Sequence, residues 1–138
     1  MVKSLAVAML CGCVLLVDGP AVSEDATDVD CSKAETQMDM NFCAAKDYET
    51  ADRALNAQWL LTKAMMDRVD TERGQKDGAK KLVTSQRAWL AYRDAQCELD
   101  GHAMDGGSAQ PLLVSSCLAD LTRKRTDELK SLDEVFGN

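Results

Sequence analysis

The sequence contains few of the side chains on which enzyme sites depend. Its 138 residues include a single histidine, His102, and only six aromatic residues. A Ser/His or Cys/His pair would therefore have one possible base and no evident group to orient it. The spacings of a phosphate-binding loop and of a calcium loop are both missing. The sequence therefore predicts that the protein is not an enzyme.

Metal sites and nucleic-acid binding are also disfavoured. No Cys-x-x-Cys pair follows residue 23, which argues against zinc. Methionines stand in two pairs, Met38 with Met40 and Met65 with Met66, but such residues are more typical of a helical core than of a soft-metal site. The net charge is −7, whereas binding to phosphates demands clustered Lys and Arg. We expect no metal, no cofactor and no nucleic acid, and an acidic domain suited to a basic protein partner.

Residues 1–23 have the order of features that is typical of a secretory signal peptide. Lys3 precedes an apolar run from Leu5 to Val17, and Gly19 and Pro20 follow it. The run is about 13 residues long, whereas a membrane-spanning helix needs roughly 20. We therefore predict a signal peptide at 1–23, an N-terminal arm at 24–35, a helical domain at 36–138, and an exported protein without a stable membrane span.

An alternative for this segment is a lipid anchor. Leu10-Cys11-Gly12-Cys13 resembles a lipoprotein box with Cys13 as the lipidated residue. The apolar run continues past Cys13 to Val17, so cleavage before Cys13 would leave apolar residues on the mature end. We therefore favour the signal peptide, with release into the periplasm or the medium.

Four cysteines remain after the signal peptide: Cys31, Cys43, Cys97 and Cys117. An even number in a small exported domain predicts two disulfides. Four cysteines allow three pairings. The local pairing, Cys31–Cys43 with Cys97–Cys117, closes two short loops, each of which would stabilise the fold by roughly 3 kcal/mol.

Helical periodicity appears in three segments. From Met38 to Val69 apolar or small residues recur three or four positions apart, and Thr36 with Asp39 forms a variant of a capping box before them. Glycines and charges interrupt the pattern at 71–78, and it resumes from 79 to 101. Residues 101–111 have the composition of a loop. Pro111 suits the first turn of a third helix that extends to Phe136.

These segments predict an all-α domain, a three-helix antiparallel bundle stapled by two disulfides. Trp59, Trp89 and Tyr92 fall on the inward stripes, so we expect them to fill the core. Arg125 interrupts the stripe of the third helix. Its head either reaches water along the core edge, or pairs with a carboxylate or the Tyr92 hydroxyl across the interface.

Three stretches together carry a resemblance to a known family. They are 31–56, with its two cysteines; 85–100, with Trp89, Tyr92 and Cys97; and 106–129, with Cys117 and Arg125. This ordered set resembles the LprI-like lysozyme inhibitor family of small exported helical domains. The resemblance implies inhibition of lysozyme by direct binding, and it implies no residue-level mechanism.

Two functions follow as hypotheses. The first is an exported inhibitor that binds a basic lysozyme, helped by its own negative charge. The second is an envelope or stress-related binding module for another exported protein. The loop at 101–111 either only links two helices or acts as a wedge that enters a substrate cleft. Binding residues are frequent in loops, which makes the second role possible. Its candidate binding residues are His102, Met104, Asp105, Gly106, Gly107 and Ser108.

Overall fold

The computed structural model describes residues 29–137. The predicted signal peptide, Cys13 and residues 24–28 of the predicted arm lie outside this range. Within it the chain forms helices and no strand, so the predicted all-α bundle with two disulfides is confirmed. The elements in order are the 3-10 helix η1 (Cys31–Lys33), α1 (Gln37–Glu72), α2 (Gly78–Gly101), the 3-10 helix η2 (His102–Met104) and α3 (Gln110–Phe136).

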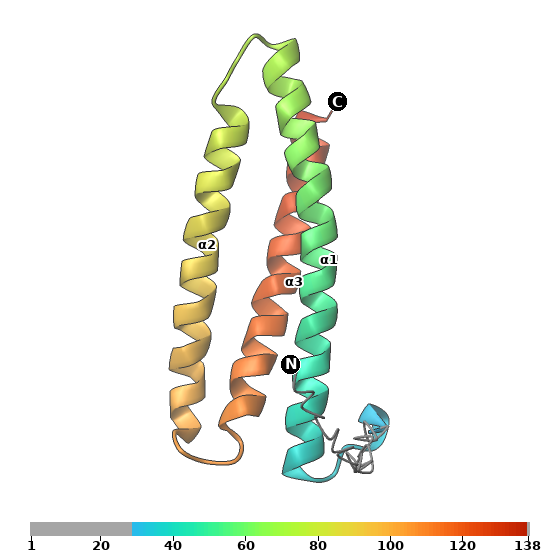
Figure 1. The fold of residues 1–138 in the computed structure, drawn as a ribbon, viewed down its shortest axis with the longest axis vertical. Helices are drawn as coiled ribbons and strands as arrows, with labels where there is room; N and C mark the ends of the chain where they lie inside the picture. The colour runs from blue at the N-terminus through green and yellow to red at the C-terminus, as the bar shows by residue number, and fades with distance from the viewer. Residues whose placement is uncertain (1–28, 138) are drawn as a thin grey trace, which may run out of the picture.

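Consecutive helices run antiparallel, so α1 and α3 run side by side in the same direction (Figure 1). Residues 73–77, here called the connector, join α1 to α2 at one end of the bundle. Residues 102–109, here called the tip, join α2 to α3 at the other end. The bundle therefore presents two separate ends with different loops.

The closest helix pair is α1 with α3, and α2 packs less tightly against both. Small side chains line the close interface: Thr62 on α1 and Ala119 and Thr122 on α3 are fully buried. Small residues let two helix backbones approach, and here the Thr62 hydroxyl donates to the Leu129 backbone carbonyl at 3.3 Å. Leu55 and Leu129 lie at the centre of the core.

The inward face of α2 differs from the predicted one. Beyond Leu82, the buried residues of this helix are Gln86, Arg93, Cys97 and Gly101, which step mostly by four. Two of these residues are polar, and the periodicity of apolar residues had placed the stripe one position away.

Tyr92 is therefore exposed over 56% of its surface, and its assignment to the core is wrong. Trp59 and Trp89 are partly buried and pack against the core cluster. Arg125 is 8% exposed.

Side chains cap the N-termini of α1 and α2. Thr36 is the N-cap of α1 and its hydroxyl accepts from the Asp39 backbone N–H, as the sequence predicted. The N-terminus of α2 is capped from a distance, because the Asp70 carboxylate accepts from the backbone N–H groups of Gly78 and Ala79 at 3.1 and 3.0 Å. Between residues 29 and 137, no helix has the length and apolar character required to cross a membrane.

Candidate functional site

The tip presents its side chains to solvent. Every residue from His102 to Ser108 is exposed. The side chains of His102 and Asp105 are 74% and 66% exposed, with 3.7 Å between the His102 Nδ1 and the Asp105 Oδ2. Met104 exposes 51% of its surface. The structure thus brings the candidate binding residues together on one projecting surface.

Hydrogen bonds fix the tip although it is exposed. The Gln110 side chain accepts from the Gly106 backbone N–H at 3.2 Å and donates to the Asp105 carboxylate at 3.3 Å. The Gly107 N–H donates to the Met104 carbonyl at 2.8 Å. Gly106 has a φ of +69°, a conformation that favours glycine. From α1, the Asn41 side chain donates to the Ser108 carbonyl at 2.9 Å.

The base of the tip is clamped covalently and sterically. Cys97 near the end of α2 is bonded to Cys117 near the start of α3, with 5.4 Å between their Cα atoms. Four residues after Cys97, α2 approaches α3 so closely that a Cβ on Gly101 would lie 2.4 Å from the Val114 Cγ2. Disulfide and glycine together hold the two helix ends in one arrangement.

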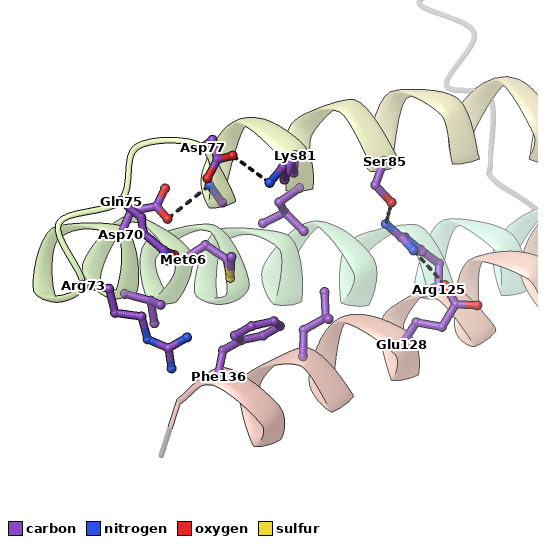
Figure 2. Close-up of a pocket in the computed structure, with 14 residues that line it drawn as sticks. Met66, Asp70, Arg73, Gln75, Asp77, Lys81, Ser85, Arg125, Glu128 and Phe136 are labelled. Carbon is purple, nitrogen blue, oxygen red and sulfur yellow. Dashed lines mark hydrogen bonds and ion pairs between the residues drawn. The ribbon is translucent and has the colours of Figure 1, made fainter.

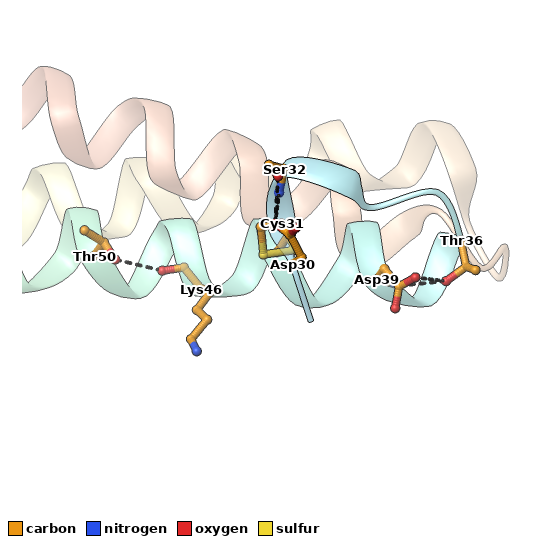
Figure 3. Close-up of a disulfide and its surroundings, with 8 residues drawn as sticks. Asp30, Cys31, Ser32, Thr36, Asp39, Lys46 and Thr50 are labelled. Carbon is orange, nitrogen blue, oxygen red and sulfur yellow. Dashed lines mark hydrogen bonds between the residues drawn. A yellow bond between two sulfur atoms is a disulfide. The ribbon is translucent and has the colours of Figure 1, made fainter. Parts of the chain in front are cut away.

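The second disulfide lies on the N-terminal side of the bundle (Figure 3). Cys31 is bonded to Cys43 of α1, with 5.5 Å between the Cα atoms, so η1 folds back on the helix. The Asp30 carboxylate accepts from the Ser32 hydroxyl at 2.7 Å and from its backbone N–H at 3.0 Å. The Ser32 hydroxyl and backbone hydrogen bonds lower the pKa of Asp30. Of the three possible pairings, the structure therefore has the local one, Cys31–Cys43 with Cys97–Cys117.

Arg125 joins α3 to α2. Its guanidinium donates to Gln86 at 2.9 Å and to Ser85 at 3.1 Å, both on α2, and to Glu128 of its own helix at 2.8 Å. The guanidinium is largely buried, with the residue 8% exposed, and its partners across the interface are not the carboxylate or the Tyr92 hydroxyl that one expectation named. The interhelical partners are an amide and a hydroxyl.

Arg93 is a buried cation on α2. It is 7% exposed and pairs with Asp94 at 2.7 Å and, less closely, with Asp52 of α1 at 3.8 Å. Its guanidinium lies 5.2 Å from the ring centroid of Trp89 and 5.6 Å from that of Tyr48. Burial raises the pKa of Tyr48, and the Arg93 charge partly offsets this. These contacts tie the middle of α2 to α1.

A cavity of about 460 Å³ opens at the connector end, between α2 and the α1–α3 pair (Figure 2). Sequence reasoning missed it, although the charged, glycine-containing stretch at 71–78 marked this end as irregular. Met66, Val69 and Leu82 supply buried apolar surface, and charged side chains surround the mouth. Figure 2 shows Arg73, at the start of the connector, and Phe136 of α3 pointing toward one another.

The described residues offer two features for binding, the exposed tip and the cavity at the connector end. Across residues 29–137, no group of three or more His, Cys, Asp or Glu side chains is placed to hold a metal ion. His102, the single histidine, has one neighbouring carboxylate in Asp105, but both side chains are largely exposed to solvent.

Comparison with known proteins agrees with this arrangement. The chain matches the family model described as "Lysozyme inhibitor LprI" over residues 29–129, a span that contains both disulfides, α1, α2 and most of α3. It is 52% identical over 114 residues to an uncharacterized protein of Rhizobium meliloti (strain 1021), a match that covers 79% of this chain and 82% of that protein. No solved structure matches the chain. The chain therefore belongs to the LprI lysozyme inhibitor family.

Proposed function

We propose that this protein is exported and inhibits a basic lysozyme by binding it directly, with the tip as the contact surface. Membership of the LprI family supports inhibition as the activity. Two disulfides support an oxidising compartment, the periplasm or the exterior. Binding alone accounts for such an activity, so no catalytic residue is required.

The observation that carries the choice of surface is the combination of exposure and rigidity at the tip. Its side chains project into solvent, while the Cys97–Cys117 bond, Gln110 and Asn41 hold its backbone. A loop that is already ordered loses little conformational entropy when it binds. A protruding, preorganised loop is the shape complementary to an enzyme cleft.

The charge of this end suits a basic partner. From Glu98 to Ala109 the chain carries three carboxylates and no Lys or Arg. Opposite charges on two proteins speed their encounter, and salt screens the effect over about 10 Å at 0.1 M ionic strength. Met104 adds an exposed apolar group beside Asp105. The association rate with a basic lysozyme should therefore fall as salt is raised.

The test is a lysis assay with the oxidised protein purified from the periplasm. Bacterial cell walls are mixed with a basic animal-type lysozyme, and turbidity is followed as inhibitor is added. We expect lysis to slow in proportion to the inhibitor. The double variant Met104→Ala/Asp105→Ala should weaken inhibition at least tenfold, about 1.4 kcal/mol, if these residues are contact residues.

A matched control removes one exposed apolar and one exposed acidic side chain elsewhere. Leu60 on α1 is 67% exposed and Asp127 on α3 is an exposed partner of Lys130. The variant Leu60→Ala/Asp127→Ala should inhibit like the wild type. Undiminished lysis at excess wild-type protein would remove the proposal. Capture of a different exported protein under those conditions would support the alternative binding module, and equal loss in both variants would exclude the tip.

A further inference from the structure

The cavity at the connector end takes no part in the proposed inhibition, because it lies at the opposite end of the bundle from the tip. Its volume of about 460 Å³ is within the range of small-molecule sites. It exists because α2 stands further from α1 and α3 than these two helices stand from each other.

The walls of the cavity are largely apolar. Met66, Val69 and Leu82 belong to the buried core cluster, and Leu132 and Phe136 pack against that cluster from α3. An apolar chain placed here would leave water and gain dispersion contacts with side chains of all three helices. The space therefore favours a hydrocarbon group over a polar one.

Charged side chains of both signs line the cavity, three cations (Arg73, Lys81 and Arg125) and three carboxylates (Asp70, Asp77 and Glu128). From Arg73 to Lys81 the chain carries four cations and one carboxylate, although the whole protein has a net charge of −7. Lys81 lies 2.7 Å from the Asp77 carboxylate, and Arg125, further in, lies 2.8 Å from Glu128. Two of the lining cations are thus already neutralised by partners.

Arg73 differs from these two. Its guanidinium lies 5.9 Å from the ring centroid of Phe136, and within residues 29–137 no carboxylate lies within 4.0 Å of it. The nearby Asp70 is buried, and both of its oxygens accept from the backbone of α2. One cation at the mouth is therefore available to an anionic group.

We propose that this cavity binds a single-chain amphiphile with a carboxylate head, a free fatty acid in its simplest form. The hydrocarbon chain lies against Val69 and Leu82, and the carboxylate pairs with Arg73 at the mouth. A cationic amphiphile would meet a like charge there, and a neutral one would gain no ion pair. This inference goes beyond the proposed inhibitor function and does not depend on it.

The experiment is a calorimetric titration of the full oxidised protein with dodecanoate below its micellar concentration. Dodecanol and dodecyltrimethylammonium serve as neutral and cationic probes of equal chain length. We expect one saturable site for dodecanoate, with binding at least tenfold weaker for the other two. Dodecanoate should also raise the unfolding temperature, because it binds the folded state.

Three variants locate the site. Arg73→Gln should weaken dodecanoate binding roughly tenfold, the loss expected for a charge-assisted bond. Val69→Phe should abolish binding because it fills the cavity from within. Arg53→Gln, which changes a 68% exposed arginine elsewhere on α1, should bind like the wild type. Should Val69→Phe fail to fold, the comparison of Arg73→Gln with Arg53→Gln still decides whether dodecanoate binds at this cavity through Arg73.

Several results would overturn the proposal. These are the absence of a saturable site, equal affinity for all three probes, or dodecanoate binding that is the same in the wild type, Arg73→Gln and Val69→Phe. Vesicles of phosphatidylglycerol provide a separate arm. If the vesicles bind the wild type and Val69→Phe equally while dodecanoate binds neither, the basic stretch 73–81 adsorbs to membranes and the cavity is not a ligand site.

Discussion

The Nε of Arg125 on α3 donates a 2.9 Å hydrogen bond to the Oε1 of Gln86 on α2. Both residues are at least nine-tenths buried, so each satisfies a polar group that water does not reach. Helix α2 packs less closely against α1 and α3 than these two pack against each other. The Arg125–Gln86 bond is therefore one of the specific links that set the position of α2.

Removing the acceptor should leave the Arg125 Nε–H buried without a partner. We expect Gln86→Ala to lower the free energy of unfolding by about 1–3 kcal/mol. Arg87→Ala changes the exposed neighbour and should stay within about 0.5 kcal/mol of the wild type. Urea titrations followed by circular dichroism measure both, and equal stabilities would contradict the role of this bond.

Asp70 should matter for the start of α2. Its carboxylate satisfies two backbone N–H groups of α2, those of Gly78 and Ala79. Asp70→Ala removes this cap and should destabilise the protein by about 1–2 kcal/mol. Asp67→Ala, on the exposed side of the same helix, should have little effect, because surface ion pairs such as Lys63–Asp67 contribute at most about 1 kcal/mol. Thermal unfolding distinguishes the two variants.

The close crossing of α2 and α3 can be tested by a substitution and its rescue. A Cβ at residue 101 would lie 2.4 Å from the Val114 Cγ2, so Gly101→Ala should destabilise the protein by about 1–3 kcal/mol. Adding Val114→Ala removes the obstructing methyl groups and should restore part of that loss. A double variant less stable than the sum of the two single changes would contradict the clash, as judged from denaturant midpoints.

The two disulfides should differ in their effect on inhibition. Replacing either pair with alanine should cost roughly 3 kcal/mol of stability. Only the change at Cys97 and Cys117 should also weaken lysozyme inhibition, because that bond holds the base of the tip. Inhibition measured well below the unfolding temperature of each variant separates stability from binding. Equal inhibition by both variants would speak against a preorganised tip.

Acid should weaken the ion pair at the start of α2. The hydrogen bond from Lys81 lowers the pKa of Asp77, and the same bond raises the pKa of Lys81. A carboxyl whose pKa is lower in the folded state stabilises the protein above its unfolded pKa, and the effect is lost as pH falls through the folded value. The difference in unfolding temperature between wild type and Asp77→Asn should therefore shrink from pH 7 to about pH 3. An unchanged difference would contradict the pair.

Sequence patterns predicted the helices, the Thr36 cap, the position of the tip and both disulfides, because each depends on local periodicity or on residues close in the chain. The rotation of α2 was not predicted. Its inward face carries the polar residues Gln86 and Arg93, which a periodicity of apolar residues does not select, while Tyr92 was assigned to the core. The cavity was also missed, because it depends on how far α2 stands from the other helices.

The pairing of α1 with α3 has a consequence for how the chain acquires its structure. The helix that is synthesised first finds its main partner in the helix that is synthesised last. Until residues beyond 110 are present, the apolar stripe of α1 has only the looser α2 to cover it. Non-local contacts of this kind form slowly, since a long segment must close before they are gained. The core between α1 and α3 can therefore close only after the last helix has been synthesised.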